Sequence, residues 1–272
     1  MVAALMLTPA SAVLAAPLGA SAAGAANCGG DYRTWLANFE RDAAAAGISQ
    51  RTIQSSLRGV TPDPRVLALD HGQGVFRQSF AQFSGRMVNA YRLRRGAELM
   101  RRYRPVFNRI EQRYGVPAPV ITAIWGLETD FGAVTGKFPT IRSLVTLAFN
   151  CRRAAEFRGE LIDALRIVDR GDMAPSQMHG AWAGEIGQTQ FLPSSYLKFA
   201  VDFDGRGRRD LIRDVPDVLA STANYLKSYG WQRGAGWNPG QPNFAVIQQW
   251  NKADVYSRTI AYFATRLAQE QH

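Results

Sequence analysis

Apolar side chains recur along most of the chain at the three- and four-residue spacing of amphipathic helices, whereas the strict alternation of a half-buried strand is scarce. Proline, glycine and capping residues divide this pattern into separate segments. The segments predicted as helices, with Pro105 kinking or splitting the third, are residues 32–46, 50–58, 87–114, 117–128, 143–170, 216–229 and 255–269. The segments predicted as linkers or loops are residues 61–64, 171–193 and 236–244, while residues 70–85 are weakly patterned. The pattern therefore predicts a mostly α-helical protein.

The first 26 residues differ from the rest because they carry no charged side chain. An apolar stretch followed by small residues is typical of a secretory signal peptide, although the usual basic start is missing. Pro9 and Pro17 interrupt the apolar run, which is too short to span a bilayer. We expect residues 1–26 to be an export leader, with a disordered Ala-rich leader as the alternative.

Two cysteines, Cys28 and Cys151, occur in the sequence. In an oxidising compartment they could pair and tie the N-terminal end to the main body. Two buried free thiols are the alternative, and the sequence does not choose between them. Lipid attachment at Cys28 is disfavoured, because Ala25, Ala26 and Asn27 lack the leucine and small residue that usually precede a lipidated cysteine.

The charge balance is basic, since 32 Lys and Arg against 22 Asp and Glu give a formal net charge of +10. A basic surface favours an anionic partner, such as nucleic acid, a membrane surface or a cell-wall polymer. The run RLRRGAELMRRYR holds six of the arginines, but on a helix such a run is usually a solvated face. Because no nucleic-acid-binding motif accompanies it, a nucleic-acid partner is not expected.

Catalytic-metal, nucleotide and serine-nucleophile chemistry have no recognisable motif in this chain. The three histidines, His71, His179 and His272, lack the spacing of metal ligands. HExxH, Walker A and GxSxG sequences are absent, and neither of the first two histidines completes a convincing Ser-His-Asp triad. The sequence therefore predicts no catalytic metal and no cofactor, which leaves chemistry based on carboxylates and amides.

Glu128 stands at the end of an apolar run, in the sequence IWGLETDFG. On the predicted helix it lies on or beside a stripe that includes Ile124, Trp125 and Leu127. Burial beside apolar rings disfavours the charged form of a carboxyl group and raises its pKa. Glu128 is therefore a candidate general acid that could hold a proton near neutral pH. A structural glutamate paired with a core arginine is the alternative.

A second candidate segment, GAWAGEIGQTQFLPSSY at residues 180–196, combines glycines with amides. Its three glycines, the last at position 187, let the backbone approach a ligand closely. The amides of Gln188 and Gln190 can both donate to and accept from sugar hydroxyl and N-acetyl groups. The glycines alone would also fit a tight loop between helices, but the neighbouring amides fit a sugar-binding cleft better.

Together these segments resemble the soluble lytic transglycosylase B family of bacterial peptidoglycan-cleaving enzymes. The motifs that carry the resemblance, from about Asp31 to Leu267, are YGVPAPVITAIWGLETDFG, GxxGxxQFLPSSY, VDFDGRGRRDL, DVLASTANYLKSYGW and NKADVYSRTIAYF. The resemblance implies a lytic transglycosylase domain over residues 27–272 in the periplasm. It further implies a lysozyme-like α-helical catalytic core at about residues 116–272, with additional helices at about residues 27–115.

The activity that the resemblance implies is cleavage of the β-1,4 bond between N-acetylmuramic acid and N-acetylglucosamine, which leaves a 1,6-anhydromuramyl end. Glu128 matches the catalytic acid of the family, and as a carboxylate it would next act as the base. Gln190 and Asn251 match residues that would hold the N-acetyl groups. Trp250, at a position where the family often has tyrosine, and Tyr256 would offer flat surfaces to sugar rings, with core packing as the alternative.

Three positions depart from the pattern of the family. Ala181 replaces a frequent serine, so one polar contact near the sugar C1 is expected to be missing. Phe83 stands where relatives have a cleft tyrosine. Glu185 replaces a frequent alanine and could face solvent, line the cleft or act as a second carboxylate.

Glu185 also keeps an alternative function open. In an inverting muramidase it would activate a water molecule opposite Glu128, whereas a non-catalytic peptidoglycan-binding scaffold would use neither carboxylate. In every case the expected partner is the glycan strand of peptidoglycan. We further expect a monomer whose basic surface associates loosely, and in a salt-sensitive way, with the wall or a membrane surface.

The segment DFDGRGRRDLIRD resembles a calcium-binding loop. Asp202, Asp204 and Gly207 match positions 1, 3 and 6 of such a loop. However, Arg206 and Arg213 occupy positions 5 and 12, where oxygen ligands are required. A guanidinium group that pairs with the aspartates could replace the metal, so the sequence predicts no tight calcium site.

Overall fold

The computed structural model describes residues 28–72 and 78–270, and the leader predicted at residues 1–26 lies outside them. Within these ranges the chain forms thirteen α-helices, one short 3-10 helix and one two-stranded antiparallel sheet, which confirms the mostly helical fold. None of the helices in the described ranges is long and apolar enough to cross a membrane.

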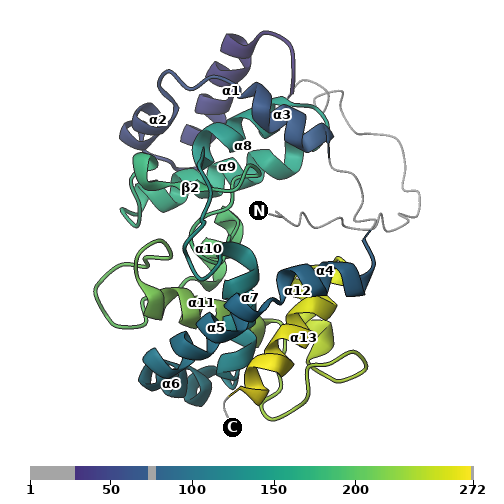
Figure 1. The fold of residues 1–272 in the computed structure, drawn as a ribbon. Helices are drawn as coiled ribbons and strands as arrows, with labels where there is room; N and C mark the ends of the chain where they lie inside the picture. The colour runs from purple at the N-terminus through teal and green to yellow at the C-terminus, as the bar shows by residue number, and fades with distance from the viewer. Residues whose placement is uncertain (1–27, 73–77, 271–272) are drawn as a thin grey trace, which may run out of the picture.

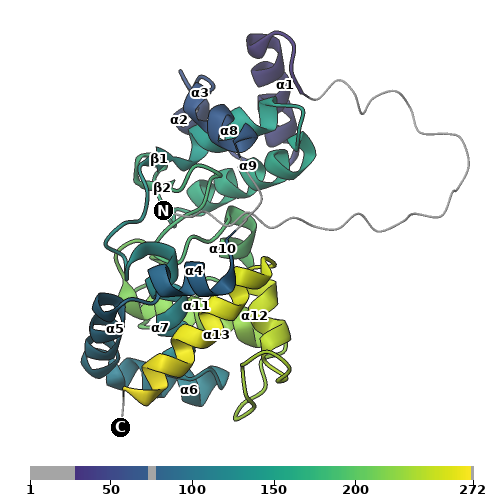
Figure 2. The ribbon, with the colours of Figure 1, turned by 45° about the vertical axis from the view of Figure 1, so that its right-hand side comes forward.

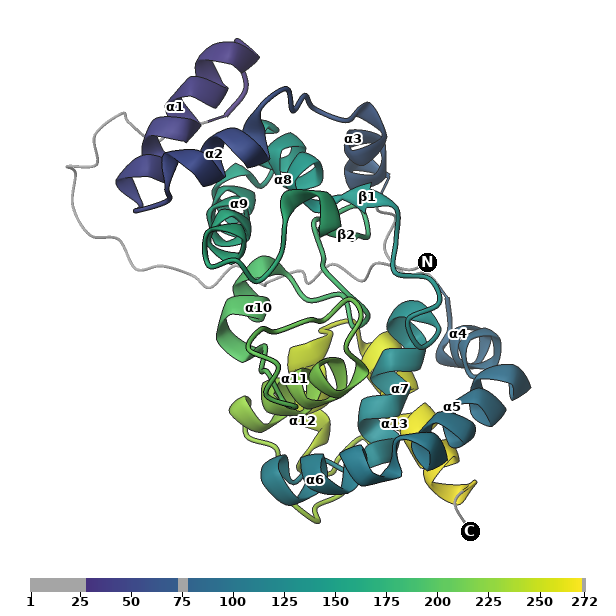
Figure 3. The ribbon, with the colours of Figure 1, turned by 90° about the vertical axis from the view of Figure 1, so that its left-hand side faces the viewer.

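The helices gather into two groups that are stacked vertically in Figures 1 and 2. The upper group consists of α1 (Tyr32–Ala45), α2 (Gln50–Leu57), α3 (Pro64–His71), α8 (Thr140–Phe149) and α9 (Ala154–Asp169). The lower group consists of α4 (Phe80–Met87), α5 (Ala90–Arg102), α6 (Arg104–Tyr114), α7 (Ala118–Thr129), α11 (Val215–Ser228), α12 (Phe244–Trp250) and α13 (Asp254–Gln269). Between them, α10 (Pro193–Phe199) contacts both α9 and α11. Figure 3 shows the sheet, β1 (Phe138–Pro139) and β2 (His179–Gly180), on the side of the upper group that faces the lower one.

Several helix boundaries follow the expected capping and breaking residues. The side chain of Ser49 accepts a hydrogen bond from the backbone N–H of Thr52 and so caps α2. Pro105 splits the predicted segment 87–114 into α5 and α6, since proline fits only the first turn of a helix. Gly115 ends α6 with a left-handed φ of 77°.

The prediction of one helix over residues 143–170 was wrong, because the chain forms α8 and α9 with a break at residues 150–153. The apolar spacing continues across this break, so periodicity alone could not reveal it. The residues in the break have other partners: Cys151 forms a disulfide, and the guanidinium groups of Arg152 and Arg153 both bind Asp70 on α3. The pattern also missed the short helices α3, α4, α10 and α12.

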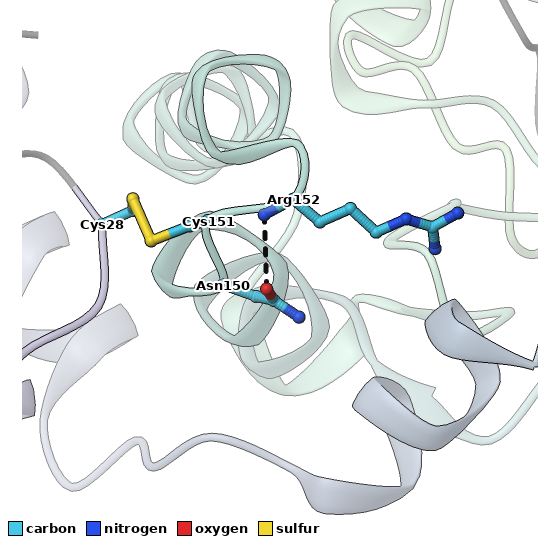
Figure 4. Close-up of a disulfide and its surroundings, with 4 residues drawn as sticks. All are labelled: Cys28, Asn150, Cys151 and Arg152. Carbon is cyan, nitrogen blue, oxygen red and sulfur yellow. Dashed lines mark hydrogen bonds between the residues drawn. A yellow bond between two sulfur atoms is a disulfide. The ribbon is translucent and has the colours of Figure 1, made fainter. Parts of the chain in front are cut away.

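Cys28 and Cys151 form a disulfide with a Cα–Cα distance of 5.1 Å (Figure 4). The bond joins the first described residue to the turn between α8 and α9, where Gly29 also donates its backbone N–H to the carbonyl oxygen of Phe149. The N-terminal end is thereby fixed to the upper group. Because both sulfur atoms are used in this bond, Cys28 has no free thiol for lipid attachment.

The helix α7 passes through the lower group and is buried on almost every side by α5, α6, α11 and α13. Gly126 is needed for this packing, since an added Cβ atom would lie 2.8 Å from the ring of Phe131 and 3.0 Å from that of Phe263. The helix ends because Asp130 and Phe131 both adopt positive φ values, 50° and 60°. Glu128 is thus held in the last turn of a buried, closely packed helix.

Candidate active site

Two side chains from the C-terminal part of the chain donate hydrogen bonds to the carboxyl group of Glu128. The indole Nε1 of Trp250 lies 3.0 Å from Oε1, and the hydroxyl of Tyr256 lies 2.9 Å from the same oxygen. Both side chains are themselves buried, with exposed fractions of 8% and 0%. Among the described residues no hydrogen-bond partner reaches Oε2, so this second oxygen is the one available to carry a proton.

Burial raises the pKa of Glu128 from 4.5 to about 7. Loss of hydration is the largest cause, and the negative charge of Glu185 acts in the same direction. The hydrogen bonds from Trp250 and Tyr256 oppose the rise, because they stabilise the ionised form. Glu128 nevertheless remains partly accessible from outside. It is therefore a group that is half protonated near neutral pH and still open to a ligand.

Glu185 is a second buried carboxyl group close enough to influence the first. Its side chain is 8% exposed and its pKa is also raised to about 7, chiefly by burial. Its Oε2 accepts the backbone N–H of Ala183 at 3.0 Å, and the positive charge of Arg153 lowers its pKa in part. The structure thus places Glu185 in the electrostatic surroundings of Glu128.

The loop between β2 and α10 is bonded directly to the end of α7. Gln188 accepts a hydrogen bond from Nε1 of Trp125 at 2.9 Å through its side chain, and from the hydroxyl of Thr129 at 2.5 Å through its backbone carbonyl. Trp125 and Thr129 flank Glu128 in the sequence, so these bonds fix the loop against the last turn of α7. The role of Thr129 was not predicted, because no sequence signal indicates this pairing across 59 residues.

The amide of Gln190 is largely used inside this loop. Its Nε2 donates to the carbonyl oxygens of Thr135 at 2.9 Å and Gly187 at 2.7 Å, and its Oε1 accepts the backbone N–H of Ala181 at 3.0 Å. Only one acceptor position on Oε1 is left for a ligand. The side-chain amide of Gln188 is likewise engaged, by Trp125 and by the carbonyl oxygen of Ile212. Most hydrogen-bonding positions of these two amides are therefore used to hold the loop together, and few are left for a ligand.

The remaining predicted site residues lie around Glu128 and its two donors. Asn251, 3% exposed, accepts the backbone N–H of Ala253 through Oδ1, which leaves its Nδ2 without a partner among the described residues. Phe83 is fully buried, with its ring centroid 6.0 Å from that of Tyr256, so it supports that ring from behind. Trp250 packs against Phe191 and Tyr225, with ring centroids at 5.5 and 4.9 Å.

An ion pair that the sequence did not indicate joins α5 to the end of α7. Nε of Arg92 lies 2.5 Å from the carboxylate of Asp130, the residue that ends α7. The charge of Arg92 also opposes the rise in the pKa of Tyr256, which burial and Glu128 keep well above its usual value. The phenol therefore stays protonated and acts as a donor at neutral pH.

The calcium-like loop is held by its own arginine. The guanidinium group of Arg206 lies 2.6 Å from Asp204 and 2.7 Å from Asp214. The predicted pairing with Asp204 is confirmed, whereas Asp202 accepts the backbone N–H groups of Arg206 and Gly207 instead. Oxygens of Asp202, Asp204 and Asp217 lie within 4.8 Å of one another, which is close enough for a shared cation.

Fold and site together define a helical protein with a protonatable glutamate that is bound by two buried donors at the end of α7. The chain belongs to the family described as Transglycosylase SLT domain, whose profile matches residues 31–241. A curated relative, membrane-bound lytic murein transglycosylase B from Escherichia coli strain K12, is 37% identical over 173 residues, which cover 61% of this chain and 48% of the relative. The chain thus aligns with about half the length of that relative.

Solved structures show the same fold over most of the chain. SltB3 from Pseudomonas aeruginosa in complex with NAG-NAM-pentapeptide is 29% identical with a TM-score of 0.84, covering 88% of this chain and 80% of that one. The same enzyme in complex with NAG-anhNAM-pentapeptide gives 30% identity and a TM-score of 0.82, covering 87% and 79%. Escherichia coli lytic transglycosylase Slt35 in complex with calcium is 27% identical with a TM-score of 0.78, covering 91% and 97%.

Proposed function

We propose that the protein is a lytic transglycosylase that cleaves the β-1,4 bond between N-acetylmuramic acid and N-acetylglucosamine in peptidoglycan. The observation that carries the proposal is Glu128, a partly accessible carboxyl group with a pKa raised to about 7 and one oxygen to which no described residue bonds. Membership of the transglycosylase family and the likeness to SltB3 with its peptidoglycan fragments support this substrate class.

The reaction begins with Glu128 protonated on Oε2. It donates this proton to the glycosidic oxygen, the bond from that oxygen to C1 of the muramyl ring breaks, and positive charge develops at C1. The carboxylate then accepts the proton of the ring's own 6-hydroxyl as O6 bonds to C1. The 1,6-anhydro ring closes, no water is consumed, and Glu128 is protonated again.

One carboxyl group suffices for both steps because the nucleophile belongs to the same sugar. An internal, well-oriented hydroxyl can supply about 7–11 kcal/mol of the barrier through proximity. A pKa near 7 leaves Glu128 equally able to give and to take a proton at neutral pH. Trp250 and Tyr256 stabilise the transient carboxylate through Oε1, and Asn251 offers Nδ2 to an N-acetyl carbonyl.

Glu185 supports a second candidate, hydrolysis by an inverting muramidase. It is buried, near Glu128 and able to ionise near neutral pH, as an activating base must be. The backbone N–H of Ala183 donates to its Oε2. The two candidates differ in their products, because hydrolysis yields reducing muramyl ends.

Mass spectrometry of the products from purified sacculi tests the proposal. Anhydromuramyl ends are expected, reducing ends would establish the muramidase, and binding without release would indicate a scaffold. Glu128→Gln should reduce release at least about 10³-fold, because the side chain serves as acid and as base. Unchanged thermal melting would show that this variant is folded. Release that persists in the folded Glu128→Gln protein would reject Glu128 as the catalytic group.

The proposed location is the periplasm. A disulfide, a basic charge balance and the leader-like residues 1–26 all suit an exported protein that acts on an anionic wall polymer. We further propose that it works as a monomer, with loose electrostatic association to the wall or membrane surface. Fractionation of cells into cytoplasm and periplasm, followed by detection of the oxidised protein, tests this location.

A further inference from the structure

A cavity of about 340 Å³ lies in the upper group of helices, apart from Glu128. Its wall is formed by the end of α2, the linker to α3, the start of α8 and the short 3-10 helix η1 (Pro175–Gln177). Four lining residues bear on its chemistry: Ser56, Arg58, Pro139 and Arg142. The volume is large enough for a short peptide segment, and the lining mixes apolar carbon with cationic groups.

The charge on the cavity wall is positive. Arg142 donates through Nε to the carbonyl oxygen of Thr61 at 2.8 Å, and its Nη1 lies 3.6 Å from Asp63. Asp63 is already bonded to Arg65 at 2.7 Å, so it neutralises Arg142 only in part. Arg58 is exposed and makes no ion pair with any residue in the described ranges. The cavity therefore offers one free guanidinium group and one that is partly neutralised.

The start of α8 adds further donors to the same wall. Pro139 stands at its N-cap position and provides no side-chain acceptor, and the N–H of Thr140 already donates to the carbonyl oxygen of Met178, which leaves the N–H groups of Ile141 and Arg142. These groups carry partial positive charge and favour anions. Independently, Ser56 lines the cavity at 4% exposure, and its buried hydroxyl has no hydrogen-bond partner in the described structure.

The cavity is joined to the candidate active site by a short stretch of backbone. Pro139 lines the cavity and pairs with His179 in the sheet, while Thr135 accepts the side chain of Gln190 in the catalytic loop. Three residues separate Thr135 from Pro139, and even a fully extended chain would span no more than about 13 Å over these four steps. A peptide attached to the muramyl ring could run along this stretch from the candidate active site to the cavity.

We propose that this cavity binds a carboxylate of the stem peptide that the muramyl units of peptidoglycan carry, with Arg58 as its principal contact. The assignment rests on the proposed function, which supplies glycan strands bearing peptide carboxylates as the substrate. The cavity then acts as a subsite for peptide-bearing strands, and peptide-free strands are cleaved without its help.

Kinetics on paired substrates test the subsite. Arg58→Gln should raise KM about three- to fivefold on peptide-bearing strands, the loss expected for one partly exposed ion pair, with kcat unchanged. On strands from which an amidase has removed the peptides, the variant should match the wild type. Arg51→Gln is the control, since Arg51 is an exposed arginine on the same helix α2 and does not line the cavity. Arg58→Glu should weaken binding of peptide-bearing strands further.

A direct binding measurement separates this inference from the proposed function. Calorimetry with the synthetic peptide L-Ala-γ-D-Glu-meso-diaminopimelate should show binding to the wild type and to Arg51→Gln, but several-fold weaker binding to Arg58→Gln. If Arg58→Gln equals Arg51→Gln on peptide-bearing strands, or weakens both substrates equally, the subsite is rejected. Wild-type protein that binds the peptide but releases no anhydro product would instead reject the proposed function alone.

Discussion

The hydroxyl of Tyr256 donates a hydrogen bond of 2.9 Å to Oε1 of Glu128, although the two residues are 128 positions apart. This bond stabilises the ionised carboxylate and so holds the pKa of Glu128 below the value that burial alone would give. Tyr256→Phe keeps the ring and removes the donor. The pKa of Glu128 should rise, and the alkaline limb of the activity profile should move upward by up to about one pH unit.

The profile of anhydro-product release between pH 5 and pH 9 measures this shift. Tyr262→Phe is the matched control, because Tyr262 lies on the same helix α13 but is exposed and bonds to Arg266. Its profile should equal that of the wild type. A Tyr256→Phe profile with a lower rate but an unmoved limb would mean that the hydroxyl does not act through the pKa of Glu128.

Glu185 should have the opposite effect. Its negative charge raises the pKa of Glu128, so Glu185→Gln should move the alkaline limb to lower pH. The other groups that act on this pair, Arg153 beside Glu185 and the donors Trp250 and Tyr256 beside Glu128, are left in place.

The control for Glu185→Gln is Glu111→Gln, an exposed position on α6. Product analysis of the same samples also addresses the muramidase alternative. If Glu185 activates water, the variant loses reducing ends along with activity, whereas a transglycosylase retains its anhydro products. An alkaline limb that stays in place in Glu185→Gln would contradict the electrostatic role.

The two raised pKa values also predict how stability depends on pH. Both carboxyl groups ionise near pH 4.5 when the chain is unfolded and at about 7 when it is folded, so the folded protein binds more protons between these values. The free energy of unfolding should therefore fall as pH rises from about 4.5 to about 7, by up to about 3 kcal/mol for each group.

Thermal melting at pH 5 and pH 8 measures this loss. The double variant Glu128→Gln with Glu185→Gln should lose most of the difference between the two pH values and should melt above the wild type at pH 8. Equal pH dependence in the wild type and the double variant would show that other groups are responsible.

The helix boundaries show which parts of the fold can be predicted from sequence. Ser49, Pro105 and Gly115 act within a few residues of their own positions, so local rules place the ends of α2, α5 and α6. The break between α8 and α9 depends on contacts of residues 150–153 with α3 and with Cys28, which no local pattern contains. The disulfide itself was one of two open alternatives, because a pairing needs three-dimensional distances.

The candidate site likewise contains some features that the local sequence predicts and others that depend on distant residues. The apolar surroundings of Glu128 are local and indicated its raised pKa, whereas the two donors come from residues more than 120 positions away. The amide chemistry of Gln190 predicts a sugar contact, but three backbone groups of its tight loop already bond to this amide. A glutamine sequence signal cannot distinguish a sugar contact from a loop brace, because both use the same donors and acceptor.

Reduction of the Cys28–Cys151 disulfide should destabilise the protein. The bond closes a loop of 123 residues, and release of such a long loop increases the entropy of the unfolded chain. Loss of about 2–4 kcal/mol in the free energy of unfolding is expected for the double variant Cys28→Ser with Cys151→Ser. Denaturant unfolding with and without a reductant measures it. The reductant should lower the stability of the wild type and leave that of the double variant unchanged.

The ion pairs of Arg206 predict that calcium does not stabilise the wild type but does stabilise a variant that lacks this arginine. Its guanidinium group already pairs with Asp204 and Asp214, so calcium would have to displace a tethered cation. Millimolar calcium should therefore leave the melting temperature of the wild type unchanged.

In Arg206→Gln the carboxylates lose that cation, and Asp202, Asp204 and Asp217 lie close enough to share a metal ion. Calcium should then raise the melting temperature of this variant, whereas Arg213→Gln, at the other non-ligand position, should behave like the wild type. A calcium-dependent rise in the wild type would show that Arg206 does not replace the metal.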